Sequence, residues 1–275
     1  MNLKIIGHFY YLLLKSKAEY RLNFFLEIFV NMFTYIISYC GIWIILRQFG
    51  SINGWNYYEV SFLYTLNLLT YGIACLFFYI PIRSIEKMVQ SGEFDIFFVK
   101  PLDPFWHLIM RQSYLGFLSH GEYQVHPQSG PHLSPSVLVF CLNKLAIGVS
   151  LHLILVLALI VLGGSLIQSA IIIFFGSLSI KYVRANNLMD IFIYQIRGFI
   201  EYPVSIYPIP IQLFITFIVP YAFVNYYPSV YLTGRVSGIT GFLFVISPAV
   251  IGVLLFWLAY RFFHKMLEEY TGAGA

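Results

Sequence analysis

The chain has 275 residues, of which 59% are hydrophobic and only 10% are charged. An average soluble domain carries about 25% charged residues, and 16 basic plus 12 acidic side chains cannot cover a soluble core of this size. The composition excludes a soluble enzyme, a disordered protein and a nucleic-acid-binding protein with a basic face. Long, continuous apolar runs favour an all-α integral membrane protein over a barrel of short alternating strands.

Residues 1–23 carry an amphipathic pattern. A polar stripe and an apolar stripe recur at helical spacing: Lys4, His8, Tyr11 and Lys15 against Ile5, Phe9, Leu12 and Leu13. The apolar run is too short to cross a membrane, and its charges follow it, unlike those of a signal peptide. We expect a helix lying in the cytosolic interface; the alternative is a frayed cytosolic tail.

About six segments predict transmembrane helices, because a span needs about 20 apolar residues. They are Phe24–Leu46, Tyr57–Ile82, 137–160, 164–182, Ile209–Asn225 and Ile239–Phe263. The third and fourth come from one continuous apolar run, Ser136–Tyr182, which we expect to break in a tight turn at Gly163 and Gly164. A shorter apolar stretch, Phe105–Ser119, is interrupted by polar side chains.

The basic residues predict the sidedness of these spans. With the N-terminus in the cytosol, 13 of the 16 lysines and arginines, Arg197 among them, fall on the cytosolic side. Only Arg47 and Arg235 fall outside, and Lys144 falls within a span. Because cytosolic loops are enriched in Lys and Arg, we expect both termini in the cytosol.

The segment 186–228 is the weakest candidate span. Polar side chains interrupt its first part, and five prolines break the rest: Pro203, Pro208, Pro210, Pro220 and Pro228. Irregular backbone at membrane depth is tolerated only where protein or water covers it. We therefore expect a proline-broken or re-entrant element before the last span.

Three polar side chains within the spans form a candidate intramembrane polar site. Glu27 and Asn31 are four residues apart, so they share one face of the first span, and Lys144 lies in the third. Such residues are functional candidates by default. The alternatives are a helix–helix hydrogen bond for Glu27 and Asn31, and snorkelling to the interface for Glu27 or Lys144.

Familiar catalytic motifs are missing from the sequence. It has no GxxxxGK[ST], HExxH or GxSxG pattern. The six-residue spacing of His120, His126 and His132 fits no usual zinc site, and Cys40 and Cys75, like Cys141, lie in apolar runs. We therefore expect no catalytic residue, no metal and no cofactor bound by this chain.

The segment 83–104 is the most informative part of the chain, between the second and third spans. Four apolar residues precede Gly92 at helical spacing: Ile82, Ile85, Met88 and Val89. Gly92 then ends the helix, and an apolar patch follows before Pro101: Phe94, Ile96, Phe97, Phe98 and Val99. An exposed aromatic patch beside a charged helix predicts docking to a partner protein; the alternative is a membrane-surface anchor.

The sequence Ser-Gly-Glu-Phe-Asp-Ile-Phe-Phe-Val-Lys-Pro-Leu-Asp-Pro at 91–104 resembles a hallmark of permease subunits of type-2 ATP-binding cassette (ABC) exporters, in the branch linked to drug-like amphiphiles. Further blocks are similar to that family: 175–190, Tyr202–Pro208 with Phe217–Pro228, and Tyr270–Gly274. Together the resemblance covers most of residues 1–113 and 160–275.

The resemblance implies a single transmembrane permease domain over residues 1–275, without enzymatic activity, in the bacterial inner (plasma) membrane. The segment 83–104 would contact a separate cytosolic ABC ATPase, which holds ATP and Mg, and a second or related permease copy would complete the transporter. The residues that this implies for coupling are Glu86, Lys87, Gly92, Glu93, Asp95, Lys100 and Pro101.

One segment departs from the family pattern. Residues 119–136 are polar where the family is largely apolar. Two explanations remain open: a lineage-specific loop, or a sequence error between residues 114 and 136. This leaves the boundaries of the third span open. Two other functions also remain open at this point: a non-transport membrane scaffold or assembly protein, and an intramembrane lipid-modifying enzyme.

Overall fold

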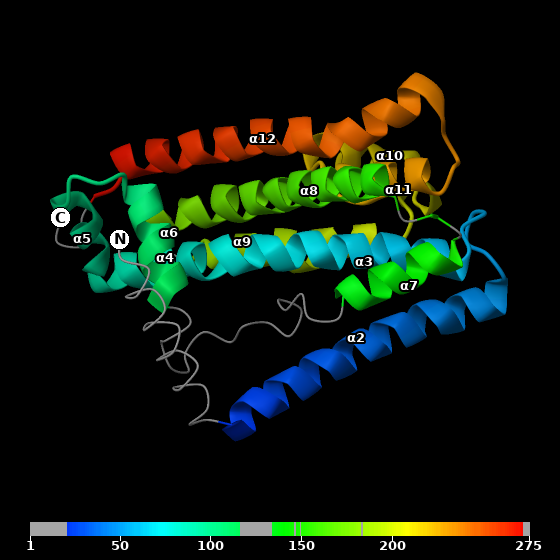
Figure 1. Cartoon of the computed structure of the whole chain (residues 1–275). Coiled ribbons are helices and arrows are strands. Elements are labelled where there is room, and N and C mark those ends of the chain that lie inside the picture. The colour runs from blue at the N-terminus through cyan, green and yellow to red at the C-terminus, as the bar shows by residue number, and fades with distance from the viewer. Residues whose placement is uncertain (1–20, 116–133, 146, 149, 183, 272–275) are drawn as a thin grey trace.

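A computed structural model describes residues 21–115, 134–145, 147–148, 150–182 and 184–271 of the chain. Within these ranges the regular elements are helices and there is no strand (Figure 1). The prediction of an all-α membrane fold is confirmed. Most of the predicted interfacial helix and of the atypical polar segment 119–136 lies outside the described residues.

Four of the described helices are long and apolar enough to cross a membrane. They are α2 (Arg21–Phe49), a continuous rod (Tyr57–Ser91), α8 (Leu151–Ser177) and α12 (Gly238–Glu268). The rod consists of α3 (Tyr57–Ala74), η1 (Cys75–Tyr79) and α4 (Ile80–Ser91). The rod, α8 and α12 lie side by side, and α2 meets the start of the rod and splays away from it (Figure 1).

Short helices gather at the two ends of this bundle (Figure 1). At one end, here called the loop end, α4 leads into η2 (Glu93–Asp95), α5 (Ile96–Val99) and α6 (Pro104–Leu115), beside the C-terminal part of α12. At the other, the far end, lie the α2–α3 turn, α7 (Ser134–Lys144) and α11 (Tyr226–Leu232).

Local signals explain where these helices begin and end. Asn56 accepts a hydrogen bond from the Glu59 backbone N–H, and the Glu59 carboxylate accepts one from the Asn56 N–H, so a capping box starts α3. The Ser150 hydroxyl caps the start of α8 by accepting a hydrogen bond from the Leu153 backbone N–H. Gly92 ends α4 in the left-handed region at φ 74°, which glycine adopts without a steric penalty.

The expected tight turn at Gly163 and Gly164 is wrong, because α8 runs unbroken through both glycines. Gly163 instead packs backbone to backbone on α12, where an added Cβ would lie 2.7 Å from the Ala249 Cα. The two predicted spans 137–160 and 164–182 are therefore divided differently: α7 is a separate helix of 11 residues, and α8 continues into η4 (Leu178–Ile180).

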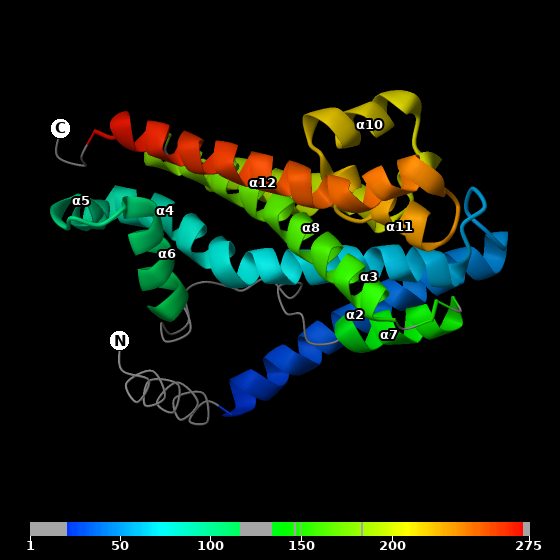
Figure 2. The same ribbon diagram turned by 45° about the horizontal axis from the view of Figure 1, so that its top comes forward.

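The segment between α8 and α12 is broken into short pieces. They are α9 (Asn186–Asp190), η5 (Ile191–Ile196), η6 (Arg197–Glu201), η7 (Val204–Ile206), α10 (Ile209–Leu213), η8 (Phe214–Ile218), η9 (Tyr221–Phe223) and α11. The pieces start beside α4 at the loop end with α9 and reach the far half of the bundle with α10 and α11 (Figure 2). The pair 209–218 and 221–232 is bent by 81°. This confirms the prediction of a broken or re-entrant element before the last span.

Candidate functional site

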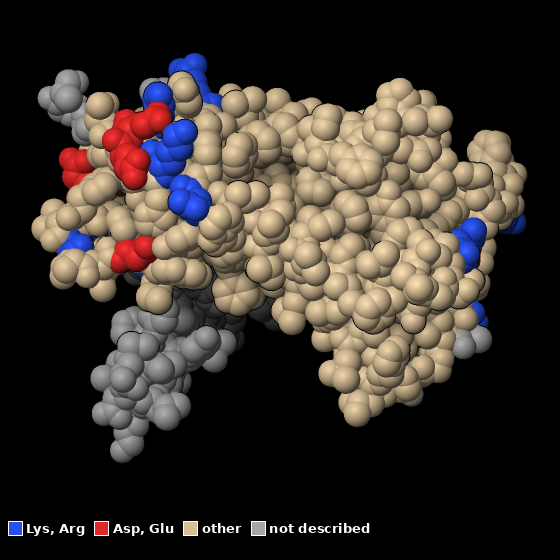
Figure 3. All heavy atoms as spheres, turned by 90° about the horizontal axis from the view of Figure 1, so that it is seen from above, with Lys and Arg blue, Asp and Glu red and all other residues tan. Residues whose placement is uncertain are grey.

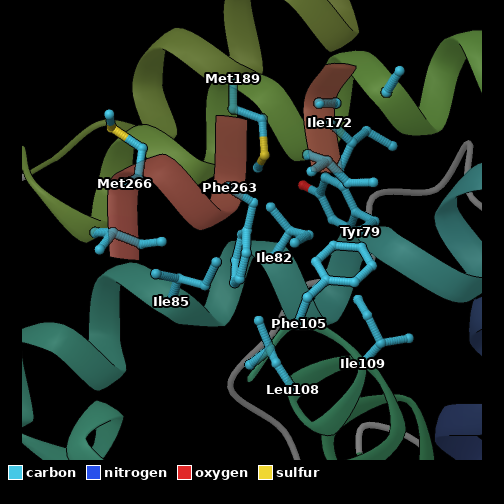
Figure 4. Packing of buried hydrophobic residues seen from close by; sticks show 14 of the residues in the cluster. Tyr79, Ile82, Ile85, Phe105, Leu108, Ile109, Ile172, Met189, Phe263 and Met266 are labelled. Atoms are coloured by element: carbon cyan, nitrogen blue, oxygen red, sulfur yellow. The ribbon is translucent and has the colours of Figure 1, made fainter. Parts of the chain in front are cut away.

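The segment 83–104 stands on a buried apolar base at the loop end (Figure 4). Ile82 and Ile85 of α4 are fully buried and point toward Phe263 of α12 and Met189 of α9. Phe105 of α6 completes this base, with its ring centroid 5.1 Å from that of Phe263. The predicted apolar stripe of α4 therefore faces the core.

The expected exposed patch is only partly exposed. Phe94 and Phe97 are fully buried, because they turn back onto Tyr270 and His107, with ring-centroid distances of 5.3 and 5.0 Å. The side chains that do project into the surroundings form what we call the apolar tip: Ile96, Phe98, Val99 and Leu102. Val99 is 81% exposed.

The residues expected to couple the segment to a partner divide into two groups. Lys87, Glu93, Lys100 and Pro101 are exposed, and Glu93 and Lys100 flank the apolar tip. Glu86 instead faces the bundle, where its carboxylate accepts a hydrogen bond of 2.9 Å from the Asn186 backbone N–H at the start of α9. Glu86 therefore holds the segment 83–104 against α9.

Asp95 and Gly92 also shape the segment. The Asp95 carboxylate accepts a hydrogen bond of 2.8 Å from the Tyr270 hydroxyl, and the Tyr270 ring stacks on Phe98 at 5.5 Å. The left-handed turn at Gly92 reverses the chain between α4 and η2. The C-terminal end of α12 is therefore fastened to the apolar tip.

Two further ties at the loop end were not predicted from the sequence. Arg83 forms an ion pair with Asp190, which joins α4 to α9, and its second nitrogen lies 3.1 Å from the other carboxylate oxygen. Asp103 caps α6 through the Trp106 N–H at 3.0 Å and accepts a hydrogen bond of 2.7 Å from Tyr260 of α12. The Asp103–Pro104 dipeptide is a helix-start signal that could have revealed the second tie.

The electrostatics of Asp103 follow from these contacts. Partial burial by itself would raise the pKa of the Asp103 carboxyl. The hydrogen bonds from the Trp106 N–H and the Tyr260 hydroxyl, with the imidazole of His264 3.2 Å away, outweigh that effect and hold the pKa below its ordinary value. Asp103 is therefore a carboxylate that fastens the segment 83–104 to α12 at neutral pH.

The predicted intramembrane polar site of Glu27, Asn31 and Lys144 is not assembled in the described side chains. Glu27 and Asn31 lie in α2, and their side chains are outside the described part of the structure. Lys144 is the last residue of α7 at the far end, exposed, with its ammonium 5.9 Å from the centre of the Phe140 ring. The structure thus places Lys144 at a helix end rather than inside a span.

Arg197, predicted from the sequence to lie on the cytosolic side, is instead buried inside the bundle. It is 1% exposed. Its Nε donates to the Ile193 carbonyl at 2.9 Å, its Nη1 donates to Asn67 Oδ1 at 3.2 Å, and its guanidinium lies 4.0 Å from the centre of the Tyr71 ring. The expected position fails because η6 is tucked between other helices, which an isolated polar stretch does not reveal.

A family model described as ABC-2 family transporter protein matches residues 29–274. The chain belongs to this family. No curated protein and no solved structure matches the chain. The family and the long apolar helices together identify the chain as a multi-pass membrane protein and as the permease subunit of an ABC transporter.

The far end of the permease is held by a clamp around Arg235, on the connection between α11 and α12. Arg235 donates to the Glu59 carboxylate at 2.8 Å and to the Gly54 carbonyl at 2.6 Å. Its guanidinium also lies 4.3 Å from the centre of the Trp55 ring. This clamp joins the first turn of α3 to the start of α12.

Proposed function

We propose that this permease exports an amphiphilic compound and is powered by a separate cytosolic ABC ATPase that docks on the segment 83–104. The observation that supports this most directly is the apolar tip, whose exposed side chains stand at the end of the bundle between Glu93 and Lys100. Exposed apolar side chains with a charged rim are typical of protein-binding surfaces.

The apolar tip is held in place by contacts with the rest of the loop end. Phe94 and Phe97 anchor it from below, and Tyr270 holds it from the side. Behind it, the ion pair Arg83–Asp190 and the hydrogen bond from Tyr260 to Asp103 tie the segment to α9 and α12. A displacement of the tip would therefore reach α9 and α12 together.

The distribution of charge supports a cytosolic loop end. Figure 3 shows charged side chains at the two ends of the molecule and an uncharged band between them. Among the described basic residues, the far end holds Arg47, Lys144 and Arg235, and the loop end holds Arg83, Lys87, Lys100, Arg111, Lys181, Arg184, Arg261 and Lys265. Since cytosolic surfaces are enriched in Lys and Arg, this orientation places the segment where a cytosolic ATPase can reach it.

The proposal has further parts, for which membership of the family is the support. We propose that the ATPase holds ATP and Mg, that the protein resides in the bacterial inner membrane, and that a second copy of this permease or a related one completes the transporter. The permease itself then performs no chemistry on its substrate; it provides the path and the surface on which the ATPase acts.

Co-purification tests the proposal. The permease is co-expressed with an ABC ATPase from the same genome, and recovery of the ATPase is compared between wild type and the double variant Phe98→Ala/Val99→Ser. Met110→Ser is the matched control, because Met110 is 69% exposed on α6 but lies outside the tip. We expect the double variant to lose the ATPase and the control to keep it.

Two results would overturn the proposal. If wild-type permease recovers no ATPase, the transport function itself is wrong. If the double variant recovers as much ATPase as wild type, the docking surface is wrong. Gly92→Ala adds a second readout: because Gly92 has a φ of 74°, this variant should keep the tip residues but misplace them, and so reduce substrate-stimulated ATP hydrolysis.

A further inference from the structure

A cluster of polar side chains lies in the apolar interior of the permease, where α3, α8 and η6 meet. We call it the arginine cluster, and it consists of Asn67, Thr70, Tyr71, Gln168 and Arg197. Each of these side chains is at most 2% exposed. Asn67 is ten residues into α3, about 15 Å along its axis, which is half of a bilayer core of about 30 Å.

The cluster is a connected network. Gln168 Nε2 donates to Thr70 Oγ1 at 2.7 Å and lies 3.5 Å from Asn67 Oδ1. Asn67 Oδ1 also accepts the hydrogen bond from Arg197, whose guanidinium covers the Tyr71 ring. Side chains from three elements that are distant in the sequence therefore converge on one point at membrane depth.

Two polar atoms of this network have no hydrogen-bond partner. They are Asn67 Nδ2 and Gln168 Oε1, and each is buried; the Tyr71 hydroxyl is within hydrogen-bonding reach of Tyr194 and Cys75. Buried polar groups in folded proteins are almost always satisfied. Unsatisfied atoms from two different side chains beside one buried guanidinium indicate a place that is completed by another molecule.

The chemistry of the cluster selects the ligand. The guanidinium carries a positive charge, and Asn67 Nδ2 adds a donor without an acceptor, beside one unpartnered acceptor, Gln168 Oε1. Anionic oxygens accept hydrogen bonds from Arg in a charge-assisted manner. An alkylammonium headgroup, in contrast, would meet the like charge of Arg197.

We propose that the arginine cluster is the site that receives the anionic headgroup of the exported amphiphile. This inference rests on the proposed function and narrows its substrate class. The headgroup site adjoins an apolar core of α8 and the broken segment, which suits the alkyl chain of an amphiphile once the elements separate. This core contains Ile167, Ile171, Ile200, Ile215 and Val219.

The cluster is sealed from the surroundings, since each of its residues is at most 2% exposed. Arg197 sits on η6, which follows the π-helix η5 and is separated from α10 by further breaks. Glu201 ends the same short helix, four residues after Arg197. An anionic headgroup at Arg197 would therefore compete with this nearby carboxyl, and entry requires η6 to move away from α3 and α8.

The test uses two probes with the same chain and opposite headgroups, monododecyl phosphate and dodecyltrimethylammonium. Equilibrium binding of each is measured on full-length permease in lipid nanodiscs, without ATPase. We expect wild type to prefer the phosphate. Arg197→Gln should lower phosphate affinity at least about tenfold, as for loss of a charge-assisted hydrogen-bond donor, while Arg197→Lys keeps part of the preference and Glu201→Gln increases it.

Asn225→Ala is the control for a purely structural effect. Asn225 Nδ2 donates to the carbonyls of Leu63 and Ile200 at 3.1 and 2.7 Å, so it holds the same elements together without belonging to the cluster. This variant should lose thermal stability and keep the phosphate preference.

The inference is overturned if wild type binds the two probes equally or prefers the ammonium, or if Arg197→Gln keeps the phosphate preference. Should Arg197→Gln fail to fold, Glu201→Gln decides, because unchanged phosphate affinity in that variant contradicts the competition described above. Since binding is measured without ATPase, failure here is distinguishable from failure of the ATPase to co-purify.

Discussion

Replacing Gly163 by alanine tests the close crossing of α8 and α12. An added Cβ would lie 2.7 Å from the Ala249 Cα, whereas carbon atoms pack best at about 3.5–4.0 Å. The neighbouring atoms are backbone, so no side chain can turn aside, and the two helices must separate by about 1 Å. Overpacking of this kind costs about 1–3 kcal/mol of unfolding free energy.

The higher helix propensity of alanine stabilises the variant, so this gain must be subtracted from the measured change in unfolding free energy. Alanine is favoured over glycine inside a helix by about 1 kcal/mol. Gly41→Ala in α2 provides this correction, because an added Cβ there meets nothing within 4 Å. The difference between the two variants isolates the strain at the crossing.

Thermal unfolding of the purified permease, followed by intrinsic fluorescence in one detergent, measures the effect. A loss of 1 kcal/mol lowers Tm by about 2–4 °C in a chain of this size range, so Gly163→Ala should unfold several degrees below Gly41→Ala. Gly252→Ala should behave like Gly163→Ala, since its Cβ would lie 2.5 Å from the Gly163 carbonyl oxygen. Equal Tm values for all three variants would refute the close crossing.

Three more predictions concern the loop end. Asp103→Asn should reduce stability by about 1 kcal/mol at neutral pH; because the pKa of Asp103 is lowered in the fold, the difference from wild type should shrink as the pH falls through that pKa, and a pH-independent difference would contradict the assignment. Tyr270→Ala should increase amide hydrogen exchange across 93–99, because it removes the ring that stacks on Phe98, whereas Tyr270→Phe should increase it much less; equal exchange in both would show that the ring contributes nothing. Lys181→Met should leave Tm unchanged, although Lys181 pairs with Glu269 at 2.5 Å, because both side chains are solvent-exposed; a clear fall in Tm would show that this pair is stronger than its exposure suggests.

The parts of the fold that could be predicted are those with a local signal. The apolar runs at Tyr57–Ile82 and Ile239–Phe263 correspond to the rod and to α12, and the prolines between 203 and 228 correctly indicated a broken element. Gly92 was correctly assigned as the end of a helix. In each case the residues that determine the conformation are neighbours in the sequence.

The parts that could not be predicted depend on distant partners. Gly163 can mark a turn or a close helix crossing, and only the position of Ala249 on α12 distinguishes the two. Arg197 reads as a loop residue until Asn67 and Tyr71 of α3 are placed around it. Phe94 and its exposed neighbour Phe98 are the same residue type four positions apart, and Tyr270, at the other end of the chain, contacts both.

Because the rod from Tyr57 to Ser91 is continuous, a small tilt about one of its ends displaces the other end by several ångströms. Its 35 residues extend about 50 Å at 1.5 Å per residue, so a tilt of only about 5° about one end displaces the other by about 4 Å. Glu59, in the first turn of the rod, holds Arg235 across 2.8 Å, and a hydrogen bond does not survive such a displacement. A slight tilt of the rod about its loop end would thus break the contact between Glu59 and Arg235 and release the clamp at the far end.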